Sequence, residues 1–242
     1  MSTYRAPGRV NLIGGQVDYH EGFVVNMAID RYVFVEMTPV SDRIAVRSRD
    51  YDGTFEIAPD GRNEPRAIEP AWGRMVGGVT RALAEEGRPP VGAALEFWSS
   101  LPIGAGLSSS SAFGVACAVA LNDAAAWDLD PLKLALAVQH AEHIATDVPC
   151  GIQDQIASVM GHADHALFLD CRTLEVEHLP LPDALRVLIM HCGVPRDLGS
   201  TPYAQRRAES EAVAHALGLR VLRDATFEQV RDKPRGRHAV TE

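Results

Sequence analysis

The chain has 242 residues, enough for one large domain, and 46% of them are hydrophobic, which excludes a disordered tail. Its formal net charge of −9 argues against a nucleic-acid-binding protein, since contacts to phosphates require clustered Lys and Arg. The only lysines are Lys133 and Lys233, and neither follows a glycine-rich loop, which excludes a P-loop nucleotidase. Any phosphate site must therefore depend on backbone amides, Ser, Arg and a metal ion.

Hydrophobic periodicity predicts a mixture of strands and helices. In chain order, we expect strands at 32–40 and 43–48, a helix over 71–86, a strand at 93–99, a loop over 102–111 with a helix to about 126, helices over 131–145 and from Gln153, strands at 166–169 and 185–191, and a helix over 203–217. Arg206 and Arg207 are interpreted as the surface of that last helix, with contact to a nucleotide as the alternative, and 232–242 as irregular. Because strands and helices do not alternate strictly, the predicted class is α+β and not a doubly wound sheet.

The sequence also predicts the compartment. No apolar run approaches the roughly 20 residues that a membrane span requires, and residues 1–7 lack the apolar core of a secretory signal. The four cysteines are scattered, without the close pairs typical of zinc sites, at Cys117, Cys150, Cys171 and Cys192. We therefore expect a cytoplasmic protein without membrane or nucleic-acid partners, whose cysteines are free thiols.

The strongest local pattern is segment 101–112, LPIGAGLSSSSA. Gly104 and Gly106 permit unusual backbone angles and the close approach of a ligand. The serines can cap the following helix, which leaves unpaired amides and the positive end of its dipole at the loop. A helix start of this kind can hold phosphate, and hydroxyls at its edge can reach Mg²⁺. From the residues alone, an ordinary capped loop before a core helix explains the segment equally well.

Segment 7–22 gathers polar side chains among glycines. They are Arg9, Asn11, Gln16, Asp18 and Tyr19. Several positioned donors and acceptors of this kind can hydrogen-bond the hydroxyls of a sugar. A turn-rich hairpin without a ligand is the structural alternative.

Segment 149–155, PCGIQDQ, places Asp154 near a predicted helix start, next to the turn at Gly151. An aspartate held there can act as a base or position a hydroxyl nucleophile. Glu142, on the preceding helix, can supply a metal ligand. Considered by itself, Asp154 has a simpler interpretation as a helix cap.

Taken together and in this order, the three segments resemble those of galactokinases, a branch of the GHMP kinases. Segment 9–19 is similar to the galactokinase signature, segment 102–112 to the ATP loop of the superfamily, and segment 150–155 to the segment with its catalytic aspartate. The resemblance extends over nearly the whole chain, because further similarity is found at 169–174, 203–211 and 237–242.

The resemblance implies a fold and a domain organisation. We expect the two-layer α+β N-terminal domain of the GHMP kinases, which is ribosomal protein S5 domain 2-like, over residues 1–195. Chains of this family continue further and carry a third, glycine-rich motif. Residues 196–242 are therefore expected to be the start of an incomplete C-terminal α+β domain.

The resemblance also implies a reaction, in which phosphate passes from Mg-ATP to the anomeric hydroxyl of a hexose, galactose by default. The cofactors are then ATP and Mg²⁺, and the partners are the sugar and ATP. Asp154 and Arg9 are the expected catalytic residues, and Ser110 and Glu142 the expected metal ligands. The expected ATP contacts are Pro102, Gly104, Ala105, Gly106, Leu107, Ser108, Ser109 and Ser110. The expected sugar contacts are Gly15, Gln16, Asp18, Gly151, Asp154 and Tyr203.

One departure from the family concerns the sugar. Galactokinases usually have Glu-His where this chain has Gly15-Gln16, and both residues reach sugar hydroxyls. Loss of an acceptor weakens the binding of galactose, and Gly15 opens space for a different or bulkier sugar. The alternatives that stay open are a GHMP kinase for another substrate, a non-catalytic relative that binds sugar and ATP, and an inactive fragment.

Overall fold

The computed structural model describes residues 1–40, 42–102, 104–191 and 203–231, with the side chains of 203 and 204 left aside. Its centre is one seven-stranded sheet with the order β4-β3-β5-β2-β6-β7, in which β1 pairs with β2 beside this path. The strands are β1 Ser2–Ile13, β2 Phe23–Val40, β3 Ile44–Ser48, β4 Thr54–Ile57, β5 Gly92–Ser99, β6 His165–Asp170 and β7 Val176–Pro180.

The long strand β2 organises the sheet. It pairs with β1 along most of its length, with β5 at 33–40 and with β6 at 23–26, in each case antiparallel. β3 and β5 form the parallel pair, which makes the sheet mixed. Val33, Val35 and Met37 alternate along β2 and are buried, as the two-residue period of a strand requires when one face covers a core.

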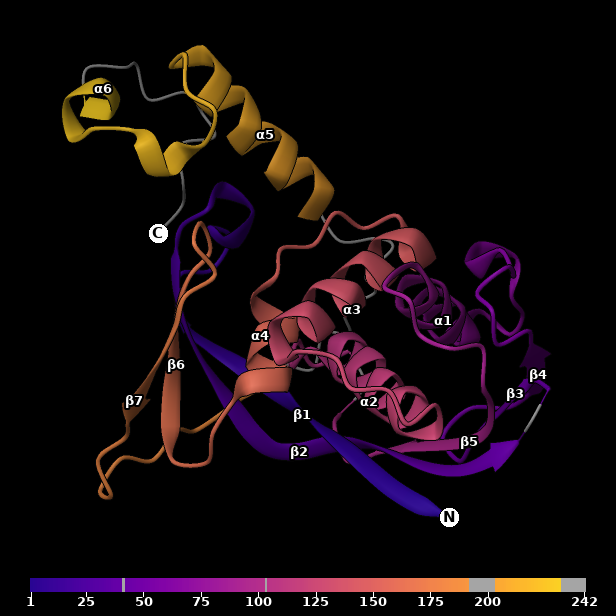
Figure 1. Cartoon of the computed structure of the whole chain (residues 1–242). Helices are drawn as coiled ribbons and strands as arrows, with labels where there is room; N and C mark the ends of the chain where they lie inside the picture. Colours follow the sequence, from indigo (N-terminus) through magenta and orange to yellow (C-terminus); the bar gives the residue numbers. More distant parts are fainter. Residues whose placement is uncertain (41, 103, 192–202, 232–242) are drawn as a thin grey trace.

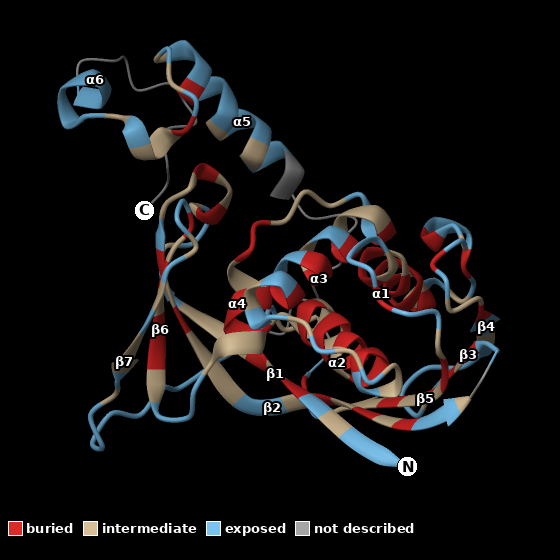
Figure 2. Ribbon diagram, in the orientation of Figure 1, coloured by how far each residue is buried: buried red, intermediate tan, exposed pale blue. Residues whose placement is uncertain are grey.

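Helices of the described part of the chain cover one face of the sheet (Figure 1). They are α1 Arg74–Glu85, α2 Ser109–Ala124, α3 Pro131–Thr146 and α4 Gln153–Met160. α2 lies at the centre of this layer and is buried on nearly all sides, because its many Ala, Val and Gly residues allow close packing (Figure 2). The sheet and its helices form the two-layer α+β fold that the sequence predicts.

A third group of elements lies beside the end of the sheet, apart from the helical layer (Figure 1). It contains α5 Tyr203–Ala216, the short 3-10 helix η5 Leu222–Asp224 and α6 Phe227–Arg231. Arg223 connects it to the sheet through an ion pair with Asp170 at the end of β6. The division into domains at residue 195 stays a prediction.

The predicted strand at 185–191 is wrong. In the structure this segment has no regular secondary structure, and its large apolar side chains are exposed, up to 79% for Leu188 and 82% for Met190. An apolar β-branched run becomes a strand only when a neighbouring strand pairs with it, and within the described residues this segment has no ladder partner. The strands β1, β4 and β7 were not predicted. The segment 237–242, which resembles galactokinases in sequence, lies outside the described residues.

The other predicted strands and helices are confirmed within a few residues, except that β2 begins at Phe23, nine residues before the predicted strand 32–40. The 3-10 residues Ala71–Gly73 precede α1, and α6 was not predicted. Within the described part of the chain, no helix has the length and the apolar character needed to cross a membrane.

Candidate active site

The glycine-rich loop is anchored to β1. The backbone amide of Arg9 donates to the carbonyl of Leu107 at 3.1 Å, and its guanidinium donates through Nη1 to the carbonyl of Gly106 at 2.9 Å. Gly8 permits this approach, because a Cβ at this position would lie 2.7 Å from the oxygen of Leu107. Gly104 and Gly106 have φ values of 68° and 73°, in the left-handed region that the sequence led us to expect for these glycines.

The expected capping of α2 by its serines is not found at Ser108. This residue is the N-cap of α2, but its backbone is left-handed, and within the described residues its side chain makes no hydrogen bond to the first turn. Its hydroxyl instead donates to Oδ2 of Asp154. The amides at the helix start are therefore left without a cap from Ser108, and the loop is connected directly to α4.

Arg9 and Asp154 form a bidentate ion pair. Nε and Nη2 of Arg9 donate to the two carboxylate oxygens of Asp154 at 2.7 and 2.8 Å. The side chains are only 13% and 25% exposed, so this pair is better protected from solvent than a surface ion pair. The helix-cap interpretation of Asp154 is wrong, because the N-cap of α4 is Ile152 and the Asp154 carboxylate faces Arg9 and Ser108.

A second carboxylate lies close to this pair. Asp18, in the 3-10 helix η1 Asp18–His20, is buried, and burial together with the nearby charge of Asp154 raises its pKa to about 6. Its carboxylate lies directly against the backbone of Gly151, where a Cβ would come within 1.8 Å of Oδ2. Only glycine at position 151 allows this contact, which brings the predicted sugar segment 7–22 and the predicted catalytic segment 149–155 together.

Glu142, on α3, has a buried carboxylate. Ser110 donates to it at 2.8 Å, Ser111 at 3.1 Å and Nε2 of Gln155 at 2.8 Å. Burial raises the pKa of Glu142, and these hydrogen bonds offset part of the effect. Ser110 and Glu142, the two expected metal ligands, are therefore adjacent, and their role as ligands stays a prediction. Gln155 was not among the predicted site residues, and its hydrogen bond to Glu142 is the contact that identifies it.

Hydrogen bonds fix the segment that leads to α4. The carbonyl of Cys150 accepts from Gln139 at 3.1 Å and lies 2.8 Å from Nε2 of His143, so that α3 holds the turn. Asn11 of β1 donates to Gln153 at 2.6 Å. These contacts connect β1, α3 and α4 around the Arg9–Asp154 pair.

Some predicted site residues lie at the rim or beyond it. Gly15 and Gln16 are exposed, and Gln16, whose φ is 66°, accepts a hydrogen bond from the hydroxyl of Tyr19 at 3.0 Å. Pro102 is exposed, and Ala105 is half-buried. Tyr203 is the first residue of α5, and its side chain lies outside the described residues.

A hollow with a volume of about 480 Å³ lies elsewhere, on the exposed face of the sheet. Its lining includes Glu36, Arg47 and Glu96, and none of the predicted site residues. The charges there compensate each other, since Glu96 pairs with Arg47 at 3.0 Å and with Arg49 at 2.7 Å. We assign the chemistry to the Arg9–Asp154 region because it has the convergent polar groups and the raised pKa values.

Comparison with known proteins gives two family matches. A family model described as "GHMP kinases N terminal domain" matches residues 74–162. A second model, described as "Galactokinase galactose-binding signature", matches residues 2–39. These ranges contain the residues of the site that lie on β1, η1, the glycine-rich loop, α3 and α4.

The chain is also similar to curated galactokinases. It is 39% identical to the galactokinase of Roseiflexus sp. (strain RS-1), with 98% of this chain and 64% of the relative covered. It is 38% identical to the galactokinase of Pyrococcus furiosus, with 93% of this chain and 62% of the relative covered. Among solved structures, Lactococcus lactis galactokinase complexed with galactose has a TM-score of 0.81 and 25% identity, with 95% of this chain and 61% of that chain covered. The Methanococcus jannaschii mevalonate kinase, 16% identical with a TM-score of 0.62 over 73% and 55% of the two chains, shares the fold. The chain thus spans less than two thirds of the length of these galactokinases.

Proposed function

The chain belongs to the galactokinase branch of the GHMP kinases, and from this premise we propose that it transfers the γ-phosphoryl group of ATP to the anomeric hydroxyl of galactose. The single observation that carries the proposal is the Arg9–Asp154 pair, which lies between the glycine-rich loop and the buried carboxylate of Asp18. Phosphoryl transfer needs a positioned hydroxyl next to a phosphate site. The glycine-rich loop can hold the phosphates, and the carboxylates of Asp154 and Asp18 can position the hydroxyl of the sugar.

ATP is assigned to the loop 102–110 and the start of α2. The uncapped amides and the helix dipole favour the negative charge of phosphates there. Arg9 is close enough to the loop to bond the carbonyl of Gly106, and its positive charge would stabilise the charge that spreads over the transferred group. With only two lysines in the chain, this role falls to an arginine and to backbone amides.

The oxygen atoms of Ser110 and Glu142 fit a magnesium ion. The carboxylate of Glu142 is buried, and burial raises its pKa. Because a buried charge is costly unless it is paired, a nearby cation would stabilise the ionised form of Glu142. Mg²⁺ bound there would neutralise charge on the phosphate oxygens. Among the residues that the structure describes, no cluster of three or more His, Cys, Asp or Glu could hold a metal, so that oxygens of ATP and water would complete the coordination.

Asp154 is assigned to the sugar hydroxyl. Each of its oxygens already accepts a hydrogen bond from Arg9, and Oδ2 a second one from Ser108, which fixes the carboxylate in one orientation. A carboxylate has about four lone-pair sites, so it can accept one more donor. Asp154 orients the anomeric hydroxyl and takes its proton as the oxygen bonds to phosphorus and ADP leaves.

The sugar is assigned to the space beside Asp18 and Gly151. An ionised Asp18 accepts hydrogen bonds from hydroxyls, and Gln16 offers an amide at the rim. Galactose is the proposed sugar because the signature match covers the strand and loop that carry these residues.

The direct test is product analysis. The protein is incubated with Mg-ATP and galactose, and phosphorus NMR follows the appearance of galactose 1-phosphate and ADP. Mannose and glucose serve as comparison sugars. We expect the ester with galactose; ADP formation that does not depend on any sugar, or an ester at another hydroxyl, would contradict the proposal.

A further inference from the structure

Arg207 of α5 contacts two segments of the site at once. Its Nη1 donates to the carbonyl of Pro149 at 2.6 Å, just before the turn that carries Gly151. Its guanidinium carbon lies 5.5 Å from the centroid of the Tyr19 ring, in the segment that carries Asp18. Nε of Arg207 donates to Glu211 one turn further along the helix at 2.8 Å, which holds the long side chain in this rotamer.

A contact with His20 also holds α5 where Arg207 can do this. Nε2 of His20, adjacent to Tyr19, lies 2.7 Å from the hydroxyl of Ser210, and that hydroxyl donates to the carbonyl of Arg207 at 2.9 Å. Burial lowers the pKa of His20, which favours the neutral ring in this contact. The face of α5 that carries Arg207 and Ser210 is therefore turned toward the sugar segment.

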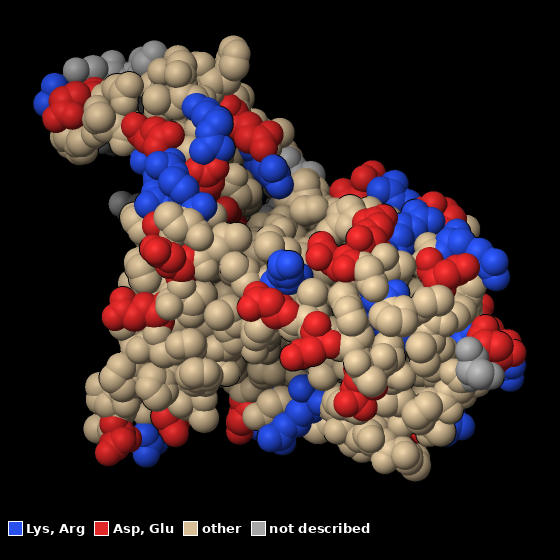
Figure 3. Space-filling model, in the orientation of Figure 1, with Lys and Arg blue, Asp and Glu red and all other residues tan. Residues whose placement is uncertain are grey.

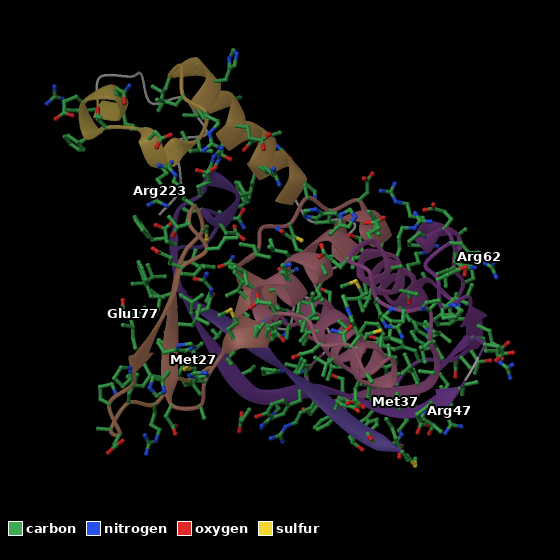
Figure 4. The ribbon with its side chains drawn as sticks, in the orientation of Figure 1. Met27, Met37, Arg47, Arg62, Glu177 and Arg223 are labelled. Atoms are coloured by element: carbon green, nitrogen blue, oxygen red, sulfur yellow. The ribbon has the colours of Figure 1, made fainter. Side chains whose placement is uncertain are left out.

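An ion-pair network anchors the chain that follows α5. Arg223 pairs with Asp170 and donates to the carbonyl of Glu21 at 2.7 Å, and the side chain of Glu21 pairs with Arg172 and Arg220. In Figure 3 charges of both signs gather where the α5–α6 segment meets the end of the sheet, and Figure 4 labels Arg223 at this junction. Glu21 is the C-cap of the short 3-10 helix that begins at Asp18, so the ion-pair network anchors the segment that carries Asp18.

The contact between Asp18 and Gly151 makes the relative placement of the two segments matter. It leaves no room for even a Cβ, so a small shift of either segment separates the carboxylate from the turn beside Asp154. Arg207 binds both segments from outside this contact.

We propose that Arg207 is a positioning residue for the sugar site, which holds the Asp18 segment against the Gly151 turn by bonding Pro149 and packing on Tyr19. This inference rests on the proposed function as far as the sugar is concerned. Its effect falls on the affinity for sugar more than on the transfer step, because the hydrogen bonds that Arg207 donates within the described residues go to Pro149 and Glu211 and not to Asp154.

The test compares Arg207→Ala, Arg207→Lys and Arg206→Ala. Arg206 is the matched control, since it lies next to Arg207 on the same helix, has the same charge and is exposed. Loss of a charge-assisted hydrogen bond predicts a rise of roughly ten-fold in the KM for galactose in Arg207→Ala, with kcat and the KM for ATP nearly unchanged. Arg207→Lys keeps the charge and one donor, and is expected to lie between the wild type and Arg207→Ala.

A second readout does not need turnover. Hydrogen exchange of residues 14–22 and 147–152, measured without ligands, is expected to be faster in Arg207→Ala and unchanged in Arg206→Ala. If no variant and not even the wild type phosphorylates galactose, the proposed function fails, and exchange alone decides on Arg207. If Arg207→Ala does not fold, Arg207→Lys gives the same comparison. Exchange and sugar KM that are equal in the Arg207 and Arg206 variants would overturn the inference.

Discussion

Arg9 and Asp154, 145 positions apart in the sequence, are joined by two parallel hydrogen bonds of 2.7 and 2.8 Å. This pair connects the first strand to the start of α4 and lies next to the glycine-rich loop through the contact of Arg9 with Gly106. Pairing of each oxygen with a fixed nitrogen sets the orientation of the carboxylate, and orientation is the main requirement for positioning a hydroxyl nucleophile.

The first prediction concerns the pH dependence of sugar use. Because burial and Asp154 raise the pKa of Asp18 to about 6, its carboxylate becomes protonated as the pH falls through 6 and accepts hydroxyl donors less well. We expect kcat/KM for galactose to fall below about pH 6 in the wild type. In Asp18→Asn, the loss relative to wild type should be larger at pH 7.5 than at pH 5.5. A ratio that does not change with pH would contradict this role.

The same group affects stability, with a sign that can be tested separately. The folded pKa of Asp18 is raised above its unfolded value of 3.8, so its favourable contribution is complete below pH 4 and is lost as the pH rises through about 6. Above that pH an ionised Asp18 destabilises the fold. Asp18→Asn should therefore be more stable than wild type by roughly 1–3 kcal/mol at pH 8, and this gain should shrink toward pH 4. Urea unfolding at both pH values measures it.

The second prediction tests the contact between the two site segments. Gly151→Ala would place a Cβ 1.8 Å from Oδ2 of Asp18, which must move although it is buried. We expect a loss of roughly 1–3 kcal/mol in the free energy of unfolding and weaker sugar binding. Asp18→Gly removes the atoms that clash, so the double variant should lose less than the sum of the two single variants. Additive losses would show that the clash is relieved by other means.

The third prediction concerns the choice of sugar. A Cβ at Gly15 would meet no atom of the described residues within 4 Å, so a glutamate can be accommodated there. Gln16 has a left-handed backbone, which histidine tolerates better than most residues. The double variant Gly15→Glu, Gln16→His should lower the KM for galactose on the order of ten-fold, since it adds hydroxyl partners at the rim. An unchanged or higher KM would mean that the site is arranged for another sugar.

The helices that cover the sheet were predictable from the sequence, as at 131–145, where a proline stands at the helix start. In the structure Asp130 also accepts from the first-turn amides of α3. Strand β1 was missed because Pro7 and Gly8 resemble a turn, whereas the structure places them at an irregularity in the β1–β2 pairing. The run at 185–191 has strand composition, but pairing depends on a neighbour, which a local pattern does not contain.

The contacts within the candidate site were also not predictable from local sequence patterns. The resemblance to a family, and not the spacing of residues, brought Arg9 and Asp154 together. The destination of the Ser108 hydroxyl was predicted wrongly because its partner lies 46 positions away. Arg207 was interpreted as surface because its contacts with Pro149 and Tyr19 come from distant segments. The roles of the site residues stay predictions.

The most direct measurement is ADP release from Mg-ATP against a panel of hexoses, with wild type and Asp154→Asn side by side and ATP affinity measured for both. Asn keeps the shape of the side chain but removes its charge and its capacity to take a proton. We predict turnover with galactose by the wild type, a decrease of at least about 10²-fold in Asp154→Asn, and nearly equal ATP affinity. Activity within a few-fold of wild type in that variant, or no turnover of any hexose by folded wild type, would contradict the assignment of Asp154 as the catalytic residue of a sugar kinase.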